Sequence, residues 1–195
     1  MPTSLVRRDE TLIRKRKEYE GILERYLGKG VRRDEEIYHQ IAIDVPRTCP
    51  EEPLFHNQAV RGALLRILYC WSIRRPASGY VQGINDLVMP IFAVLMGGVQ
   101  NNDDILSRLV TVEADSFWCL SKLLDTIQDN YTFNQIGIHR QVSRLREIVS
   151  RTDAYLVNHL DKEGIDFIQF SFRWMNCLLL REFPLNLCNR LWDTY

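Results

Sequence analysis

Apolar side chains recur along this chain at the three- and four-residue spacing of amphipathic helices. Over residues 8–27 they fall mostly on one helical face, and Gly28 and Gly30 follow where such a helix would end. No alternation over four or more residues indicates a half-buried strand, so the sequence predicts an all-α, multi-helix fold. The same spacing predicts further helices over residues 34–44, 56–75, 103–128 and 137–150, and one that begins at Asn85 or Asp86 and ends at Gly97 and Gly98.

Two segments are more apolar than the rest. Residues 165–181 are apolar around most of the helical circumference, which predicts a central helix of the core. Residues 87–99 form the longest nearly unbroken apolar run, but they are shorter than the roughly 20 residues that a membrane span requires. We therefore expect a buried helix there and no transmembrane segment.

The chain has no glycine-rich linker long enough to separate two domains. We expect residues 1–30 to form an N-terminal helical extension and residues 31–195 to form one domain, with residues 28–31 as the candidate hinge. The extension carries four consecutive basic residues, 14–17, which form either a contact for acidic lipid or protein or a solvated helix face; the second role is the commoner one. Residues 185–195 begin a helix without a stop signal, so we expect the domain to be incomplete at its C-terminus.

Composition narrows the possible functions. The 195 residues are 46% hydrophobic, enough for a sizeable core, and 25 basic residues balance 25 acidic ones, so no overall field favours nucleic acid. The five cysteines are odd in number and scattered, which is typical of a reducing compartment, and no cysteine or histidine spacing indicates a metal site. The first residues lack the apolar stretch of a secretory signal, so we expect a cytosolic protein.

Two polar residues follow predicted structural breaks. Pro46 disfavours helical angles at the residue before it, so we expect Arg47 to emerge on a stiff turn after the helix of residues 34–44. Gln82, 35 positions after Arg47, follows the loop that we expect over residues 77–79. A fixed guanidinium and a fixed carboxamide are what GTP hydrolysis needs, since one neutralises charge on the phosphoryl oxygens and the other places the attacking water. Taken singly, Arg47 could form a surface ion pair with Asp44, and Gln82 could be an ordinary loop amide.

Short motifs occur in a fixed order around and after these two residues. They are Ile41-x-x-Asp44-x-x-Arg47, Tyr80-x-Gln82-Gly83-x-Asn85, Glu113 to Cys119, Phe172-Arg173-Trp174, Arg181 to Pro184, and Leu191-Trp192-Asp193. In that order they resemble the motifs of TBC-domain proteins, the GTPase-activating proteins of Rab GTPases. The resemblance runs from about Gly30 to the last residue, and Ile84 stands where many relatives have methionine.

The resemblance implies an all-helical domain that docks on a Rab-family GTPase in its GTP state. Arg47 would be the arginine finger and Gln82 the glutamine finger, both supplied in trans to the partner's nucleotide. We interpret the motif residues Trp118, Arg173, Trp174 and Trp192 as packing and internal bonding residues. The residues that support the two fingers would be Asp44, which orients the arginine, and Tyr80, Gly83 and Asn85.

The chain itself has no nucleotide-binding motif. It contains no phosphate-binding loop of the Gly-x-x-x-x-Gly-Lys-Ser/Thr type and no hydrolase motif, so we expect no independent catalysis and no cofactor of its own, with GTP and Mg²⁺ carried by the partner. The resemblance further implies a role in vesicle trafficking, peripheral on endomembranes and closest to the Golgi-acting branch. The alternative is a non-catalytic scaffold of the same fold that binds a Rab or another protein, although such a module has no need for both Arg47 and Gln82.

Overall fold

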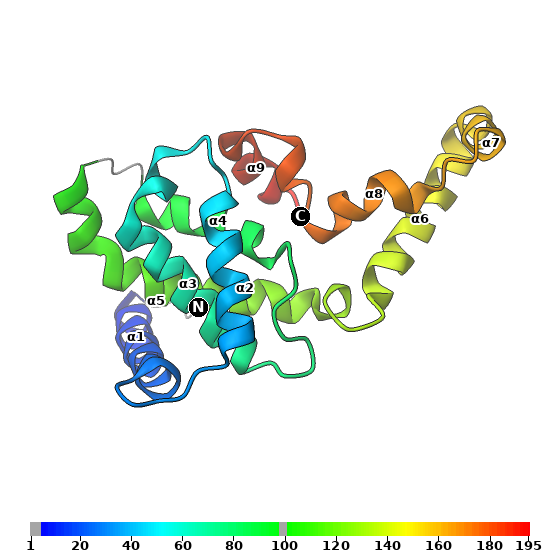
Figure 1. Ribbon diagram of the computed structural model, residues 1–195. Coiled ribbons are helices and arrows are strands. Elements are labelled where there is room, and N and C mark those ends of the chain that lie inside the picture. The colour runs from blue at the N-terminus through cyan, green and yellow to red at the C-terminus, as the bar shows by residue number, and fades with distance from the viewer. Residues whose placement is uncertain (1–4, 98–100) are drawn as a thin grey trace. The chain divides into compact units, whose positions relative to one another are not determined.

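The computed structural model describes residues 5–97 and 101–195, which fold into two compact units that divide between residues 124 and 125. Every regular element of these residues is helical, and Figure 1 traces them in chain order. The predicted all-α class is confirmed. None of the helices in the described part of the chain is long and apolar enough to cross a membrane.

The first unit is built around one buried helix, α3. The residues that periodicity placed on its inner face, among them Val60, Leu64 and Ile67, are buried, and α1, α2 and α4 pack against it. The helices of this unit are α1 (Leu5–Leu27), α2 (Glu35–Asp44), α3 (Gln58–Ile73), α4 (Ile84–Met96) and α5 (Asn102–Thr126, whose last two residues belong to the second unit), with the short 3₁₀ helices η1 (Val45–Arg47) and η2 (Pro53–His56).

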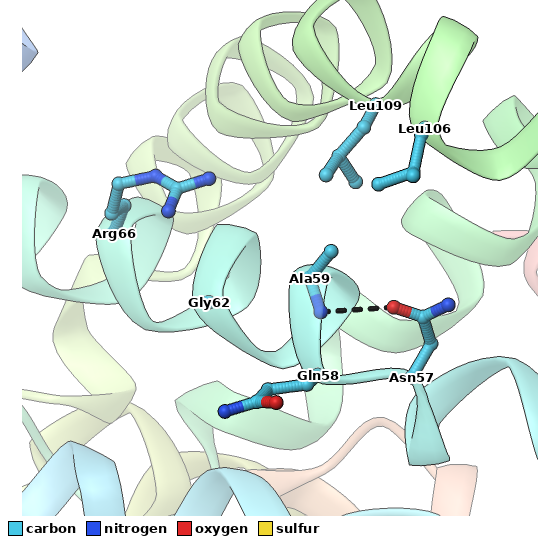
Figure 2. A pocket seen from close by; sticks show the side chains of 7 residues that line it. All are labelled: Asn57, Gln58, Ala59, Gly62, Arg66, Leu106 and Leu109. Atoms are coloured by element: carbon cyan, nitrogen blue, oxygen red, sulfur yellow. Dashed lines mark hydrogen bonds between the residues drawn. The ribbon is translucent and has the colours of Figure 1, made fainter. Parts of the chain in front are cut away.

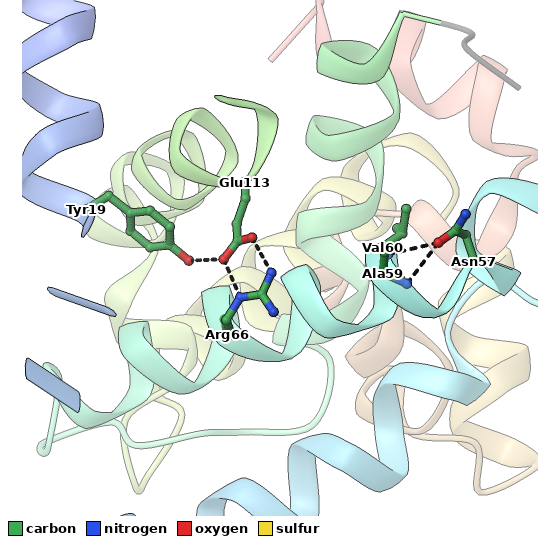
Figure 3. A network of polar contacts seen from close by, with 6 residues as sticks. All are labelled: Tyr19, Asn57, Ala59, Val60, Arg66 and Glu113. Carbon is green, nitrogen blue, oxygen red and sulfur yellow. Dashed lines mark hydrogen bonds and ion pairs between the residues drawn. The ribbon is translucent and has the colours of Figure 1, made fainter. Parts of the chain in front are cut away.

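Helix α3 begins two residues later than predicted, because a side chain caps it. The Asn57 carboxamide oxygen accepts hydrogen bonds from the backbone N–H groups of Ala59 and Val60, at 2.9 and 3.4 Å (Figure 3). These N–H groups have no partner within the helix, so an asparagine at this position fixes the start of α3.

Helix α4 holds the apolar run predicted over residues 87–99, which is buried over residues 87–90 and at Phe92 and Met96, whereas Val94 is 59% exposed. The predicted burial is therefore confirmed only for part of the run. The helix begins earlier than predicted, at Ile84, with Gly83 as its N-cap, and continues through Pro90. Gly97 ends it in the left-handed conformation, as predicted, and the second predicted stop, Gly98, lies outside the described residues.

Helix α1 is held on α5 by polar contacts. The buried Glu113 carboxylate accepts from the Tyr19 hydroxyl at 2.8 Å and from two nitrogens of Arg66 at 2.6 and 2.8 Å (Figure 3). The Arg16 guanidinium forms a second bidentate ion pair, with the Asp115 carboxylate. Burial and the neighbouring carboxylate raise the pKa of Tyr19, and the hydrogen bond with Glu113 raises the pKa of Arg66, so the phenol stays a neutral donor and the guanidinium a cation.

These contacts revise the interpretation of the basic run at residues 14–17. Lys15 lies 3.8 Å above the Trp118 ring and, like Arg16, serves the packing of α1 on α5. Arg14 and Lys17 are exposed, as expected of a solvated face. The run is thus half internal contact and half solvated surface.

We expect Glu113→Ala to destabilise the first unit by about 2 to 4 kcal/mol, because it leaves the Tyr19 hydroxyl and the Arg66 guanidinium without their acceptor. The Arg66 side chain is 38% exposed and can take up water, which keeps the loss at the lower end for a broken internal ion pair. Urea unfolding measures the change. The matched control is Glu147→Ala, which breaks the exposed pair with Arg151 and should cost about 0 to 1 kcal/mol. Equal losses in both variants would contradict this account of the Glu113 network.

The second unit has its own small core, made by Ile138, Val142, Val157 and Phe167. Its helices α6 and α8 pack against each other, and α7 packs on α6. The elements are η3 (Gln128–Asn130), α6 (Ile136–Thr152), α7 (Ala154–Lys162), α8 (Phe167–Asn176), η4 (Leu180–Glu182) and α9 (Leu185–Trp192).

Helix α8 differs from the central helix predicted over residues 165–181. It ends at Asn176, because Leu178 and Leu179 adopt left-handed backbone angles with φ of 48° and 61° that no α-helix contains. Its apolar residues Ile168 and Phe170 are only partly buried in the core of this unit. The prediction of a fully surrounded helix was wrong, since apolar residues on every face indicate burial only where other elements supply the cover.

The motif tryptophans have the packing roles that we predicted for them. The Trp118 indole N–H donates to the Lys15 carbonyl at 2.8 Å, and the Trp192 indole N–H donates to the Leu178 carbonyl at 3.0 Å. Trp174 packs edge-on against Phe170, and Arg173 forms an ion pair with Glu182.

No disulfide joins any of the five cysteines, all of which lie in the described part of the chain. Cys70, Cys177 and Cys188 are buried and behave as small apolar residues, and burial raises the pKa of Cys70 to about 12. The reducing compartment predicted from their number and scatter stays a prediction.

Candidate functional site

Arg47 is the last residue of η1, directly after α2. Contrary to our prediction, Pro46 does not turn the chain out of helical angles: Val45 has φ −54° and ψ −46°, and α2 passes straight into the 3₁₀ turn. The bond from the Val45 N–H to the Ile41 carbonyl and the burial of the Val45 side chain offset the steric cost of a helical residue before proline. Arg47 is nevertheless exposed, as predicted, and it forms no hydrogen bond or ion pair with any other described residue.

Gln82 is exposed on the short loop between α3 and α4. Its neighbours on both sides are held by the fold: Tyr80 is 8% exposed, and Gly83 is buried at the start of α4. Gly83 has φ +109° and ψ −25°, a conformation in which a side chain would clash with the backbone, so this position requires glycine. A tight, glycine-dependent turn therefore presents Gln82 to solvent.

Two hydrogen bonds between side chains join the loops that carry these residues. The Tyr80 hydroxyl donates to the Asp44 carboxylate at 2.9 Å, and the Asn85 amide donates to the Thr48 hydroxyl at 2.8 Å. We call residues 44–48 the arginine segment and residues 80–85 the glutamine segment. Each exposed residue thus lies between two attachment points that hold its segment against the other one.

The structure gives Asp44 a partner other than the one implied by the family resemblance. Its carboxylate accepts from Tyr80, and no described ion pair joins it to Arg47. The simple surface ion pair between Asp44 and Arg47 is therefore absent. The side-chain bond of Asp44 thus holds the arginine segment to Tyr80.

Asn85 lies inside the turn, 4% exposed, and bonds to backbone as we expected: its carbonyl oxygen accepts from the Gly83 N–H at 2.9 Å. Thr48, by contrast, is a residue that the sequence analysis missed. The only signal for it was a hydroxyl directly after the arginine, a weak one, because its partner lies 37 positions away.

Two pockets of the first unit lie away from the candidate residues. One, of about 590 Å³, lies between the start of α3 and α5, where Leu106 and Leu109 point toward Ala59 (Figure 2). The other, of about 260 Å³, lies beside Tyr19 and Glu113. Neither is lined by any of the six candidate residues. Among the described residues no group of three histidine, cysteine, aspartate or glutamate side chains could hold a metal ion.

Arg47 and Gln82, the two candidate catalytic residues, are both exposed on the surface. A guanidinium offers five N–H donors with a permanent charge, and a carboxamide offers both donors and an acceptor. Two exposed groups of this kind can add donors, an acceptor and a positive charge to a site on another macromolecule. Fold and site together define an all-helical protein with an arginine and a glutamine exposed on two segments that hydrogen bonds join.

The family can now be stated. The sequence model of the Rab-GTPase-TBC domain matches residues 5–195, and the chain belongs to this family. The matched range begins within α1; the boundary that we predicted at residue 30 stays a prediction.

Known relatives agree with this assignment. The chain is 50% identical over 204 residues to TBC1 domain family member 22B of Homo sapiens and 47% identical over 208 residues to the GTPase-activating protein GYP1 of Saccharomyces cerevisiae. Each comparison covers the whole chain but only 40% and 33% of the relative. The crystal structure of the Ypt/Rab-GAP domain of Gyp1p matches with a TM-score of 0.91 and 47% identity, over all of this chain and 65% of that one.

Proposed function

We propose that this chain accelerates GTP hydrolysis by a Rab-family small GTPase in its GTP state and that Arg47 and Gln82 are the residues it supplies. One observation carries the proposal: both side chains are exposed on segments that two hydrogen bonds hold together. Membership of the Rab-GTPase-TBC domain family and the similarity to Gyp1p support the choice of partner.

In the proposed mechanism, Arg47 acts on charge. As the bond to the γ-phosphoryl group breaks, negative charge develops on the phosphoryl oxygens and on the leaving group. A guanidinium at the bridge between the β- and γ-phosphates neutralises that charge, and its planar fork contacts two oxygens at once. An arginine that forms no ion pair of its own is available for this role without first breaking a contact.

Gln82 acts on the attacking water. Its amide oxygen accepts a hydrogen bond from the water, while its amide nitrogen donates to the γ-phosphate, so one group sets both the position and the direction of attack. The left-handed turn at Gly83 and the buried Tyr80 hold the backbone on either side of it. The side chain that it replaces is the water-positioning glutamine of the GTPase itself.

The remaining candidate residues support the two fingers in this proposal. Asp44 and Tyr80 form one link between the segments, while Asn85 orders the turn at Gly83. In this proposal the chain forms no covalent bond to the substrate, and it needs no cofactor of its own, because GTP and Mg²⁺ arrive bound to the partner. With this function we infer a cytosolic location and a role in vesicle trafficking.

Phosphate release from a panel of purified, GTP-loaded Rab GTPases tests the proposal. Catalytic amounts of the chain should speed release from at least one of them. The control is Arg151→Ala, which removes an exposed arginine from the second unit and should leave the rate unchanged. Binding to a GTP-loaded Rab without faster release would favour the alternative, a non-catalytic scaffold of the same fold.

A further inference from the structure

The Thr48 hydroxyl joins the end of α2 to the glutamine segment. Its oxygen donates to the Asp44 carbonyl at 2.8 Å and accepts from the Asn85 amide nitrogen at 2.8 Å. A hydroxyl has one proton to donate and lone pairs to accept with, so both bonds form at once. Thr48 is only 6% exposed, and water has little access to replace either bond.

The Asn85 carboxamide continues this link toward Gln82. Its oxygen accepts from the Gly83 N–H, which leaves its nitrogen as the donor to Thr48. The orientation of the amide is therefore determined by its partners, since a backbone N–H cannot accept. One carboxamide thus contacts the residue after Gln82 and the residue after Arg47.

A second link lies on the other side of both fingers. Asp44 and Tyr80 are joined at 2.9 Å, so Arg47 lies between Asp44 and Thr48 in the chain, and Gln82 lies between Tyr80 and Gly83. A single link would leave the two segments free to pivot about it. Two links remove that freedom, so the distance between the finger backbones is set before any partner binds.

We propose that Thr48 is a positioning residue, whose hydroxyl, through Asn85, sets the spacing of Arg47 and Gln82 so that both reach one γ-phosphate. The inference rests on the proposed function and adds to it a residue outside the arginine and glutamine pair. The cost of losing the hydroxyl follows from geometry, because a catalytic group displaced by about 1 Å loses on the order of a hundredfold in rate.

Two substitutions of Thr48 test the role of its hydroxyl. Thr48→Val keeps the branched shape and removes both bonds, and we expect kcat for stimulated GTP hydrolysis to fall on the order of ten- to a hundredfold while KM for the GTPase changes by less than about threefold. Thr48→Ser keeps the hydroxyl and should retain most of the rate. Ser72→Ala is the matched control, since it removes another buried hydroxyl of the first unit, bonded to the Leu68 carbonyl in α3, and should leave kcat unchanged. Wild-type kcat in Thr48→Val, or an equal loss in Ser72→Ala, would overturn the inference.

A double-mutant cycle separates positioning from folding. If Thr48 acts by spacing the two fingers, Thr48→Val should cost less than about twofold once Arg47→Ala has removed one of them. If Thr48→Val lowers kcat by the same factor with Arg47→Ala as without it, the two losses are independent. Thr48 would then serve stability alone, and the inference would fail. If Thr48→Val does not fold, Asn85→Ala breaks the same link from the other side, because it removes the amide that donates to Thr48, and the same losses are expected.

Hydrogen exchange tests the link without any GTPase. The Gly83 N–H should exchange faster in Thr48→Val than in wild type, although the substitution is 35 positions away, and Thr48→Ser should restore its protection. Unchanged exchange overturns the inference and leaves the proposed function intact. If Thr48→Val does speed exchange of the Gly83 N–H but the wild-type chain stimulates no Rab, the proposed function is rejected, and with it the catalytic purpose of the link.

Discussion

Replacing Arg47 by alanine should lower the stimulated rate of GTP hydrolysis by on the order of 10³-fold or more, the range that an arginine supplied to a GTPase contributes. Without the guanidinium, the charge that develops on the phosphoryl oxygens has no counterion from this chain. Single-turnover phosphate release from a GTP-loaded Rab, at saturating concentrations of the chain, measures the loss. Because Arg47 is exposed and forms no hydrogen bond or ion pair with other described residues, the free energy of unfolding should stay within about 0.5 kcal/mol of wild type.

Arg47→Lys distinguishes charge from geometry. Lysine keeps the positive charge but offers an ammonium in place of the planar fork, so we expect only a small part of the rate to return. Full activity of Arg47→Lys would show that charge alone suffices. Full activity of Arg47→Ala would remove the arginine finger from the mechanism.

Replacing Gln82 by alanine should lower the stimulated rate by on the order of 10²- to 10³-fold, the typical effect of losing one preorganised hydrogen-bonding group from a transition state. The attacking water would keep its access but lose its orientation. The same phosphate-release assay measures the loss. Gln169→Ala, which removes an exposed glutamine from α8, is the control and should leave the stimulated rate unchanged.

A variant partner makes this prediction sharper. A Rab whose own water-positioning glutamine has been replaced should still respond to the wild-type chain, because Gln82 supplies the missing carboxamide. The same Rab should not respond to Gln82→Ala. A wild-type chain that fails to stimulate this Rab would show that the partner's own glutamine performs the step.

The candidate residues themselves were visible in the sequence, but their contacts were not. Spacing and motif order singled out Arg47 and Gln82, and both are exposed. Asp44 was expected to orient Arg47, three positions away, and the sequence did not indicate that its carboxylate bonds with Tyr80, 36 positions away. Thr48 was missed for the same reason, because no residue near it in the sequence indicates that it bonds with Asn85.

The errors in the fold have a similar origin. Pro46 predicted a break at Val45, but a buried side chain and one hydrogen bond to Ile41 keep that residue helical. Residues 165–181 read as one long buried helix, and the left-handed Leu178 and Leu179 shorten it. In both cases a local preference of about 1 kcal/mol was overridden by contacts with other parts of the chain.

The sequence by itself determined the helical class, most of the helix positions and the exposed arginine and glutamine, because periodicity, caps and breakers act between residues no more than four positions apart. Only the tertiary structure decided that the segments of Arg47 and Gln82 are linked to each other, through Asp44–Tyr80 and Thr48–Asn85. Hydrogen bonds across 36 and 37 positions form only once helices α2, α3 and α4 have packed, and no spacing along the chain encodes which side chains then meet.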